Sequence, residues 1–289
     1  MLCGEGVPMS DPSLIHGPAI ISVSGGRTSG YMLWRILQAH GGTLPEGVHA
    51  VFANTGREMP ATLDFVRDMQ AAWGVPITWL EFTARRTDGF EVVNHNSASR
   101  AGEPFAALLA AQAWLPSPVQ RNCTTELKIR TMKRWVMATL GWRHWTNIVG
   151  LRADEHRRVQ RIREAKRKDR WEIATPLHDA GVCQPDVLTF WRSQPFDLHL
   201  SGKWEGNCDG CFLKSRAAIL RMHADHPERM HWWAEMEAVP RGTAGRNRKF
   251  RRDREPYATL SDLVRSMPRL PFDETMVEGG EDCGWACGV

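Results

Sequence analysis

Short apolar runs alternate with amphipathic stretches along the first half of the chain. The runs lie at residues 19–23, 48–53, 76–82 and 145–151. Each run has the length of one buried strand. The stretch between the second and third runs has apolar residues at helical spacing, with Pro60 at its start and Gly74 at its end. Strands that alternate with helices of this length predict an α/β fold, in which an open, mostly parallel sheet is wound with helices.

Outside these runs the pattern is irregular or helical. Residues 83–118 show no clear period, so we expect an insertion or an active-site loop there. Apolar spacing predicts helices over 121–140, 184–192, 215–223 and 227–237. Because the later helices follow Trp171 without strands between them, we expect a helical C-terminal part that carries cysteines.

These patterns divide the chain into four parts. Residues 1–18 are rich in glycine, proline and serine, which predicts a flexible N-terminal tail. Residues 19–170 form the sheet domain, and residues 171–240 form the helical part packed on it. Residues 241–289 are first basic and then acidic, which predicts a C-terminal tail.

The composition is that of a soluble protein with a sizeable core. The chain has 289 residues, of which 42% are hydrophobic. No apolar run approaches the ~20 residues of a membrane span. The N-terminus lacks the basic start and apolar stretch of a secretory signal. We therefore expect a cytoplasmic protein with no membrane partner.

Positive charge is concentrated in two runs. The net charge is only +4, but residues 156–170 carry eight Lys/Arg against two acids, and residues 241–254 repeat the bias. Such runs are either solvated helix faces and mobile loops or a footprint for polyphosphate or nucleic acid. The sequence leaves both interpretations open.

A loop suited to anions follows the first strand. It contains Ser24, Gly25, Gly26, Arg27, Thr28 and Ser29, and it passes directly into a helix. Such a turn aims backbone N–H groups and the positive end of a helix dipole at an anion. Glycines allow close approach of the backbone, and hydroxyl groups add donors. The loop has neither the lysine of a Walker motif nor the spacing of a dinucleotide-binding turn.

Two more segments end strands at the same edge of the predicted sheet. Residues 54–60 follow the second strand, and residues 150–158 follow the fourth. Ligands of open parallel sheets lie beyond the carboxyl ends of the strands. We therefore expect these segments and the loop at 24–29 to form one site.

Several segments, in order, resemble the phosphoadenosine-phosphosulfate (PAPS) reductase family. The loop at 24–29 is similar to the SGGxDS loop of the wider PP-loop superfamily, with Thr28 in place of aspartate. The other matching segments are 52–58, 121–128, 150–155, 176–180 and 185–187, and the resemblance covers roughly residues 19–215. It implies an adenine nucleotide α-hydrolase-like fold, with 19–170 as the domain that binds ATP or a sulfonucleotide.

The resemblance also implies roles for single residues. The loop residues Ser24 to Ser29 would bind phosphate or sulfate oxygens. The residues beside the nucleotide would be Asn54, Thr55 and Gly56, and the sources of positive charge would be Lys128, Arg152 and Arg158. Lys128 and Arg152 would be catalytic, because fixed cations stabilise the charge on a transferred phosphoryl or sulfonyl group. Family members often have aspartate in place of Asn54, so a carboxylate that helps to hold Mg²⁺ is missing.

The cysteines point to metal or redox chemistry. They number seven, and an odd number in a cytoplasmic chain argues against a disulfide framework. Cys208 and Cys211 form a C-x₂-C hook, a spacing that suits zinc or an iron–sulfur cluster. The natural candidates for the other two ligands are Cys123 and Cys183.

The family resemblance favours a [4Fe–4S] cluster over zinc at these cysteines, and it makes residues 171–240 the cluster-binding part. Cys123 aligns with a segment in which cluster-containing sulfonucleotide reductases have a cysteine pair. Asn122 occupies the first position of that pair, so Cys183 would replace the missing ligand.

The end of the chain carries a second pair of cysteines. The segment from Glu281 to Gly284 resembles the Glu-Cys-Gly tail whose thiolate attacks the sulfonyl sulfur in the reductases. Cys283 would then be the catalytic nucleophile, and Cys287 would resolve the thiosulfonate. The alternative is an exposed tail with incidental cysteines.

Three functions fit this sequence. The first is a PAPS-reductase-like iron–sulfur enzyme that binds PAPS, adenosine phosphosulfate or ATP and reduces or transfers sulfur, with a thiol or electron donor as partner. The alternative is an ATP-pyrophosphatase-type sulfurtransferase that adenylates and thiolates a nucleic acid. The Cys-Gly tail favours the first, whereas the intact Ser-Gly-Gly loop and the basic runs favour the second. The third is a regulator that binds nucleotide and cluster without catalysis.

Overall fold

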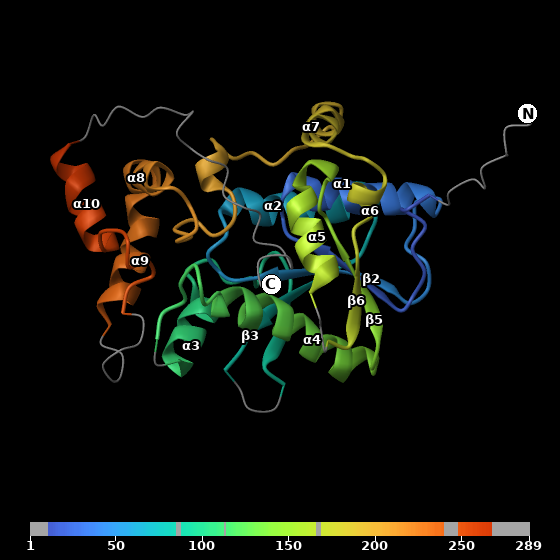
Figure 1. Ribbon diagram of the computed structural model, residues 1–289, viewed down its shortest axis with the longest axis horizontal. Coiled ribbons are helices and arrows are strands. Elements are labelled where there is room, and N and C mark those ends of the chain that lie inside the picture. Colours follow the sequence, from blue (N-terminus) through green and yellow to red (C-terminus); the bar gives the residue numbers. More distant parts are fainter. Residues whose placement is uncertain (1–10, 85–87, 113, 166–168, 240–247, 268–289) are drawn as a thin grey trace, which may run out of the picture.

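The centre of the molecule is a six-stranded sheet. The computed structural model describes residues 11–84, 88–112, 114–165, 169–239 and 248–267. The strands are β1 (Ala19–Val23), β2 (Val48–Asn54), β3 (Ile77–Phe82), β4 (Phe90–Val93), β5 (Trp145–Val149) and β6 (Trp171–Ala174). Their order is β4-β3-β2-β1-β5-β6, and all neighbours are parallel except β3 and β4 (Figure 1). The predicted open, mostly parallel α/β sheet is therefore confirmed.

Helices cover both faces of this sheet, which explains why its central strands are apolar throughout. One face packs against α1 (Arg27–Ala39) and α2 (Pro60–Trp73), and α7 (Gln184–Arg192) packs on the outside of these two helices. The other face packs against a continuous helical segment and α5 (His156–Glu164). That segment consists of η1 (Thr124–Arg130), α4 (Thr131–Trp135) and η2 (Val136–Leu140), with π-type turns at both ends. The predicted bounds of α2 are confirmed, because Pro60 begins it and Gly74 ends it in the left-handed conformation.

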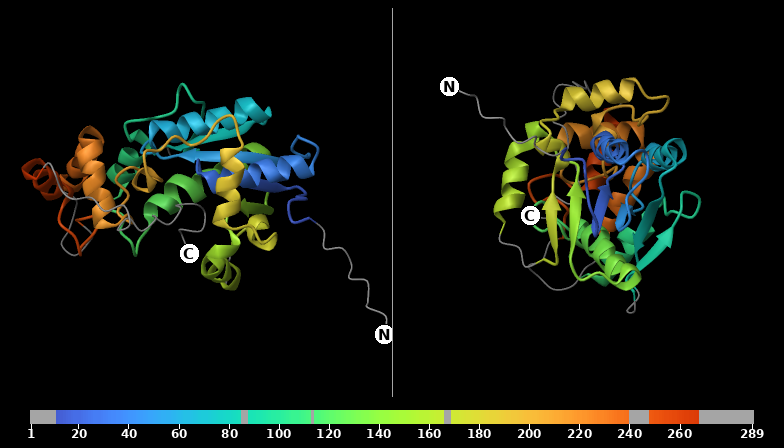
Figure 2. Two further views of the ribbon diagram at one scale, coloured as in Figure 1. Left: turned by 90° about the horizontal axis from the view of Figure 1, so that it is seen from above. Right: turned by 90° about the vertical axis from the view of Figure 1, so that its right-hand side faces the viewer.

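A second group of helices lies at one end of the sheet, on the left in Figure 1. It contains α3 (Glu103–Ala111), α8 (Arg216–Asp225), α9 (Pro227–Ala238) and α10 (Tyr257–Ser266), which share one apolar core. Figure 2 shows from two further sides that α8, α9 and α10 lie beside the sheet rather than over either face. Cys208 and Cys211 are buried in this core, so the cysteine-bearing helical part is present as predicted. Three short helices, η3 (Ala153–Glu155), α6 (Pro176–Asp179) and η4 (Lys203–Glu205), occupy connections.

The structure moves the predicted boundary at residue 170. β6 extends the sheet beyond it, and α7 packs on α1, so residues 171–192 belong with the sheet. The irregular stretch 83–118 also contains an edge strand, β4, and a helix, α3. Both unpredicted strands have four residues and lie at the two edges of the sheet, where their apolar runs are too short to stand out.

Parts of both predicted tails are packed against the fold. Near the N-terminus, Ile15 is buried and its backbone N–H donates to His40 Nε2 at 3.1 Å. Near the C-terminus, Phe250, Tyr257 and Leu260 are buried against α8 and α9. The described parts of 1–18 and 241–289 thus contain residues packed against the fold, and a few apolar residues at helical spacing suffice to dock α10.

Within the described part of the chain, no helix is both long and apolar enough to cross a membrane.

Candidate functional site

The loop between β1 and α1 is shaped by one serine and one glycine. The Ser29 hydroxyl accepts the backbone N–H of Ser24 at 3.0 Å, contacts Ser24 Oγ at 2.9 Å and donates to the Gly26 carbonyl at 3.0 Å. Gly25 has φ +79°, and a Cβ atom there would lie 2.5 Å from Thr62 Cγ2. The loop thus folds tightly over α2 and directs its backbone to the N-terminus of α1, the arrangement expected of an anion site.

A pocket opens over this loop. Its lining from the loop comprises Ser24, Gly25, Gly26, Arg27 and Thr28, and other segments contribute Glu58, Lys128 and Arg152. All three predicted strand-end segments line this pocket, through residues 24–28, Glu58 and Arg152. Arg152 Nη1 also donates to Thr28 Oγ1 at 3.1 Å, which joins two of these segments directly. These side chains give the pocket two cations that face the loop from outside it.

The predicted cations have acidic partners. Arg27 forms a two-pronged ion pair with Asp197 at 2.7 and 2.8 Å, which directs it along the pocket wall. Arg152 pairs with Asp154 at 3.0 Å and with Glu155 at 3.4 Å. Arg158 also pairs with Glu155, and it does not line the pocket. Its predicted role in nucleotide binding stays a prediction.

Asn54 does not line the loop pocket, and its predicted place beside a nucleotide stays a prediction. Asn54 is fully buried, and its amide donates to Glu81 Oε1 at 2.6 Å and to the Ser99 carbonyl at 2.8 Å. Its own oxygen accepts the Gly56 N–H at 3.0 Å. An aspartate at this position would place a second carboxylate against Glu81, so the amide is required by the neighbouring strand.

A second pocket lies next to the first and is lined by cysteine. Cys123, Cys208 and Cys211 line it together with apolar side chains of Phe105, Leu127, Phe212 and Trp233. Thr55 and Lys128 also line it. The structure therefore brings together three of the four predicted metal ligands, from two separate segments.

The remaining cysteines are placed differently. Cys183 begins α7, where its backbone N–H donates to the Asp186 carboxylate at 2.7 Å and its thiol faces the Gly181 carbonyl at 3.7 Å. It is not part of the lining of the cysteine pocket. Cys283 and Cys287 lie outside the described residues.

The three thiols line one pocket, which makes them the candidate ligands of a metal group. Among the described residues, no three Cys, His, Asp or Glu side chains are close enough to hold one metal ion. Zinc would need its ligands within about 2.3 Å of one centre. A [4Fe–4S] cluster instead takes thiolates spread around a larger body. A pocket with three thiols on its wall is consistent with that arrangement and supplies three of its usual four ligands.

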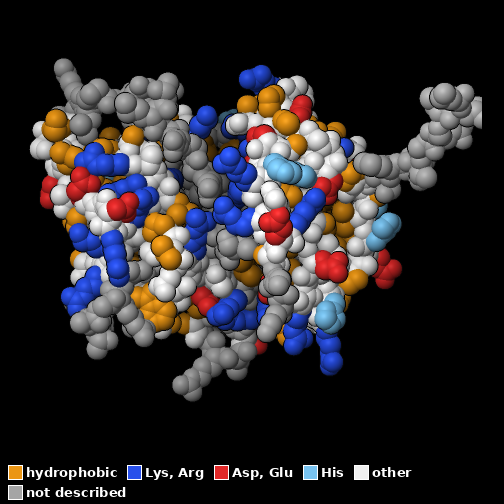
Figure 3. Space-filling view, viewed as in Figure 1, with side chains coloured by type: hydrophobic (Ala, Val, Ile, Leu, Met, Phe, Trp, Pro, Cys, Tyr) orange, Lys and Arg blue, Asp and Glu red, His pale blue; other side chains and the backbone are white. Residues whose placement is uncertain are grey.

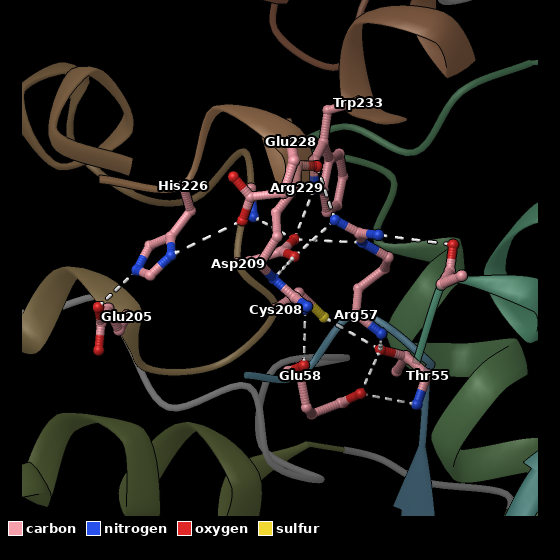
Figure 4. A network of polar contacts seen from close by, with 12 residues as sticks. Thr55, Arg57, Glu58, Glu205, Cys208, Asp209, His226, Glu228, Arg229 and Trp233 are labelled. Atoms are coloured by element: carbon pink, nitrogen blue, oxygen red, sulfur yellow. Dashed lines mark hydrogen bonds and ion pairs between the residues drawn. The ribbon is translucent and has the colours of Figure 1, made fainter. Parts of the chain in front are cut away.

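A buried ion network fixes the hook to the turn after β2 (Figure 4). Asp209 is fully buried and pairs with Arg57 at 2.6 Å and with Arg229 at 2.7 Å. Trp233 Nε1 donates to the same carboxylate at 2.6 Å. Because every charge here is paired, the loop that carries Cys208 is held rigidly against residues 55–58.

Lys214 closes the hook from within. Its ammonium donates to the carbonyl oxygens of Gly206, Cys208 and Asp209 at 2.6, 2.8 and 3.2 Å. Burial lowers the pKa of Lys214, and the nearby anionic groups oppose that shift. The lysine thus ties three carbonyl groups of this irregular loop together.

One chain of contacts connects the two pockets. Lys128 lines both, and its Nζ atom lies 3.6 Å from Glu58 Oε1. The other Glu58 oxygen accepts the Thr55 N–H at 3.0 Å and the Thr55 hydroxyl at 2.8 Å. The Thr55 oxygen lies 3.3 Å from Cys208 Sγ. Figure 4 shows Thr55, Glu58 and Cys208 in contact.

Sequence reasoning missed the residues that join the pockets and support the hook. They are Arg57, Glu58, Asp209 and Lys214. Arg57 and Glu58 lie in the segment 52–58 that carried the family resemblance, and Asp209 lies inside the hook. These residues could have been predicted from their charge, because each lies in or next to a segment that the sequence had already linked to a site.

The first basic run is partly a helix surface. α5 exposes Arg157 and Arg161, whereas Arg163 pairs with Asp179 at 2.5 Å. Of the second run, the structure describes 248–254, where Arg254 donates to the Lys214 carbonyl at 2.8 Å. Figure 3 shows basic side chains gathered along the middle of one face, between the sheet and the α8–α10 group.

Comparison with known proteins gives one clear relative. No family model matches the sequence. The chain is 30% identical over 207 residues to the protein of Escherichia phage lambda named "Uncharacterized nin region protein ORF290", which covers 69% of this chain and 67% of the relative. The chain belongs to the family of this lambda nin region protein. The relative's name states no activity, so membership of this family does not indicate which reaction the chain catalyses.

Among the solved structures that match this chain is the U34-tRNA thiolase NcsA from Methanococcus maripaludis with its [4Fe-4S] cluster. The TM-score is 0.38 at 11% identity, and the match covers 93% of this chain and 82% of that chain. A match this distant carries no inference about activity.

Proposed function

We propose that this protein is an ATP-dependent sulfurtransferase that binds the nucleotide at the loop 24–29 and works on an acceptor beside the cysteine pocket. The observation that carries the proposal is the position of Lys128, whose side chain lines the anion pocket and the thiol pocket at once. A reaction that combines a nucleotide phosphate with sulfur needs these two sites in contact.

In this proposal the loop binds the α-phosphate. The backbone N–H groups at the start of α1 and the hydroxyl of Thr28 contact the phosphate oxygens, and Lys128 and Arg152 offset their charge. Fixed cations in a partly enclosed pocket stabilise the additional negative charge of the transition state without reorganising.

The chemistry then has two steps. An acceptor oxygen attacks the α-phosphorus, the bond to the β-phosphate oxygen breaks, and pyrophosphate leaves with the electron pair. Sulfur delivered as hydrosulfide displaces the adenylated oxygen, AMP leaves with that oxygen, and the released protons go to solvent. No external oxidant or reductant is required.

The thiols of Cys123, Cys208 and Cys211 would hold a [4Fe–4S] cluster in the second pocket. When bound, such a cluster supplies a soft metal site with affinity for sulfide. The protein's own part is to exclude water with Phe105, Leu127 and Trp233, and to keep the site next to Lys128.

A nucleic acid is the acceptor class that the surface favours. Arg157 and Arg161 are exposed on α5, in the first basic run, and α5 follows the segment after β5 that contributes Arg152 to the pocket. Exposed arginines on a helix that follows a pocket-lining segment suit a polyanionic acceptor.

Sulfonucleotide reduction is the competing function, because residues 281–284 resemble the tail of the PAPS reductases. It would use the same loop for PAPS and a thiolate of Cys283 as nucleophile. The two functions release different products, which makes them separable in one experiment.

The experiment compares products from ATP and from PAPS. The protein, purified without oxygen, is incubated with ATP, sulfide and either bulk tRNA or sheared DNA, and pyrophosphate and thio-nucleosides are measured. We expect pyrophosphate release that depends on one of the nucleic acids. Lys128→Met should lower kcat/KM at least about 100-fold. Lys133→Met is the matched control, because Lys133 lies on the same helical segment over the Trp171 ring and should leave the rate unchanged.

Sulfite release from PAPS, abolished in Cys283→Ser, would overturn the proposal in favour of the reductase. Pyrophosphate release that is equally fast in Lys128→Met would overturn the assigned site.

A further inference from the structure

Glu58 is an anionic residue in a pocket otherwise built for anions. Its side chain lines the loop pocket together with the phosphate loop, Lys128 and Arg152, yet the residue is only 3% exposed. A buried carboxylate beside a phosphate site costs free energy unless it has a cation to bind.

The two oxygens of this carboxylate have different surroundings. Oε2 accepts two hydrogen bonds from Thr55. Oε1 accepts no hydrogen bond from any described residue, although it is buried. The Lys128 ammonium lies 3.6 Å from Oε1, which is beyond hydrogen-bond distance. One oxygen therefore fixes the group, and the other is available to a ligand.

The backbone of Glu58 is also held in place. It pairs with Cys208 in an isolated β-bridge, and its carbonyl accepts Arg229 Nη2 at 2.8 Å. With Thr55 holding Oε2, the carboxylate cannot turn away when a nucleotide enters. Oε1 thus keeps its position in the pocket.

Nucleotide binding would leave this charge uncompensated. A phosphate beside the loop attracts Lys128, which then cannot also offset Glu58. A divalent cation resolves the conflict, because Mg²⁺ is usually bound by one or two carboxylates together with substrate phosphates. Asn54, the position that the family resemblance associates with a carboxylate, is committed to Glu81 and does not line the pocket.

We propose that Glu58 Oε1 is the protein ligand of a divalent cation that bridges it to the phosphates of the bound nucleotide. This inference rests on the proposed nucleotide site. It assigns the metal to the turn after β2 that also contacts Cys208, so the cation lies on the wall between the two pockets.

The test measures binding of α,β-methylene ATP by calorimetry in EDTA, in Mg²⁺ and in hexaamminecobalt(III). The cobalt complex offsets phosphate charge but keeps its ammonia ligands, so it cannot accept a carboxylate. For the unchanged protein we expect Mg²⁺ to raise the affinity at least about tenfold, a usual size for coupled ligands. The cobalt complex should not reproduce this gain.

Glu58→Gln should change the affinity for the analogue in EDTA and also the gain in affinity that Mg²⁺ gives. The amide does not repel phosphate, so affinity in EDTA should rise, while the Mg²⁺ gain should fall below about twofold. Electron paramagnetic resonance of Mn²⁺ with the analogue gives a second readout, because the bound Mn²⁺ signal should be lost in Glu58→Gln. Glu81→Gln is the matched control: Glu81 is equally buried on the adjacent strand but does not line the pocket. It should keep the Mg²⁺ gain, and circular dichroism checks that both variants are folded.

Several outcomes would overturn the inference. They are an unchanged Mg²⁺ gain in Glu58→Gln, no Mg²⁺ gain in the unchanged protein, or an equal gain from the cobalt complex. In each of these the analogue still binds, so the proposed function survives. If the analogue binds under no condition, both the nucleotide site and the cation are refuted.

Discussion

Single atoms decide the shape of the phosphate loop. Gly25 combines a positive φ with a close approach to Thr62, so two separate penalties apply to any side chain there. The Ser29 hydroxyl takes part in three contacts within the loop, so the serine at that position has a structural role.

The two penalties at Gly25 can be separated by mutation. Gly25→Ala should destabilise the protein by about 1–3 kcal/mol and weaken nucleotide binding. Gly41→Ala is the control for backbone strain alone, because Gly41 also has positive φ (+68°) but open space around it. Adding Thr62→Ser to Gly25→Ala removes the clashing methyl group and should recover part of the loss. Urea unfolding of the four proteins measures this, and equal losses at Gly25 and Gly41 would contradict the steric account.

Asn54 illustrates a second rule at this scale, namely that the neighbouring strand selects the residue. Asn54→Asp should cost about 2–4 kcal/mol, because it loses the donors to Glu81 and Ser99 and places two carboxylates in contact. Adding Glu81→Gln restores one donor and removes one charge, so the double variant should be more stable than Asn54→Asp alone. Urea unfolding gives both values. A double variant that is less stable than both Asn54→Asp and Glu81→Gln would refute the proposed interaction between these two side chains.

At the scale of elements, the packing of the α8–α10 group buries a histidine, His223, and disfavours its protonation. His223 on α8 is 4% exposed, and burial lowers its pKa from 6.5 to about 4. Its Nδ1 atom lies 3.0 Å from Ser261 Oγ on α10, so the neutral ring joins the two helices.

This histidine predicts how stability depends on pH. Between pH 6.5 and 4 the unfolded chain takes up a proton that the folded protein does not, so stability falls as the pH falls through this window. The accumulated loss from this group is up to about 3 kcal/mol. His223→Leu should remove this contribution and flatten the urea-unfolding free energy between pH 6.5 and 4. An unchanged slope would show that other groups control it.

For the whole molecule, the decisive feature is the contact between two pockets built from distant segments. Lys128 and Glu58 come from opposite sides of the sheet edge, and Cys123 meets Cys208 only through the packing of η1 against the helical group. The cysteine pocket therefore depends on how the two parts of the fold dock.

The cysteines give a test at this scale. Protein purified without oxygen should be brown and absorb near 400 nm, as iron–sulfur proteins do. Cys211→Ser should abolish this absorbance, whereas Cys183→Ser should retain it, because Cys183 does not line the pocket. Iron and zinc analysis accompanies the spectra. A colourless protein that contains zinc would refute the cluster, and loss of colour in Cys183→Ser would restore that residue as a ligand.

The sequence was sufficient for much of the fold and for one half of the site. Apolar runs identified the strands with two buried faces, and Pro60 and Gly74 marked the ends of α2. The loop 24–29 was recognisable because its residues are contiguous. The edge strands β4 and β6 were missed because their short runs carry little burial signal. Glu58 was missed because its partner Lys128 is brought to it only by the tertiary fold.

The docking of α10 also sets an order of events during synthesis. The Tyr257 hydroxyl donates to the Gly210 carbonyl at 2.6 Å, inside the turn between Cys208 and Cys211. A ribosome makes this tyrosine almost fifty residues after the turn that it supports. While the nascent chain is shorter, the two thiols stand on an unfinished loop with α8 and α9 uncovered. A cofactor that reached these thiols before the chain left the ribosome would bind a less rigid loop than that of the completed protein. Insertion of the cofactor after α10 has docked therefore favours the correct geometry.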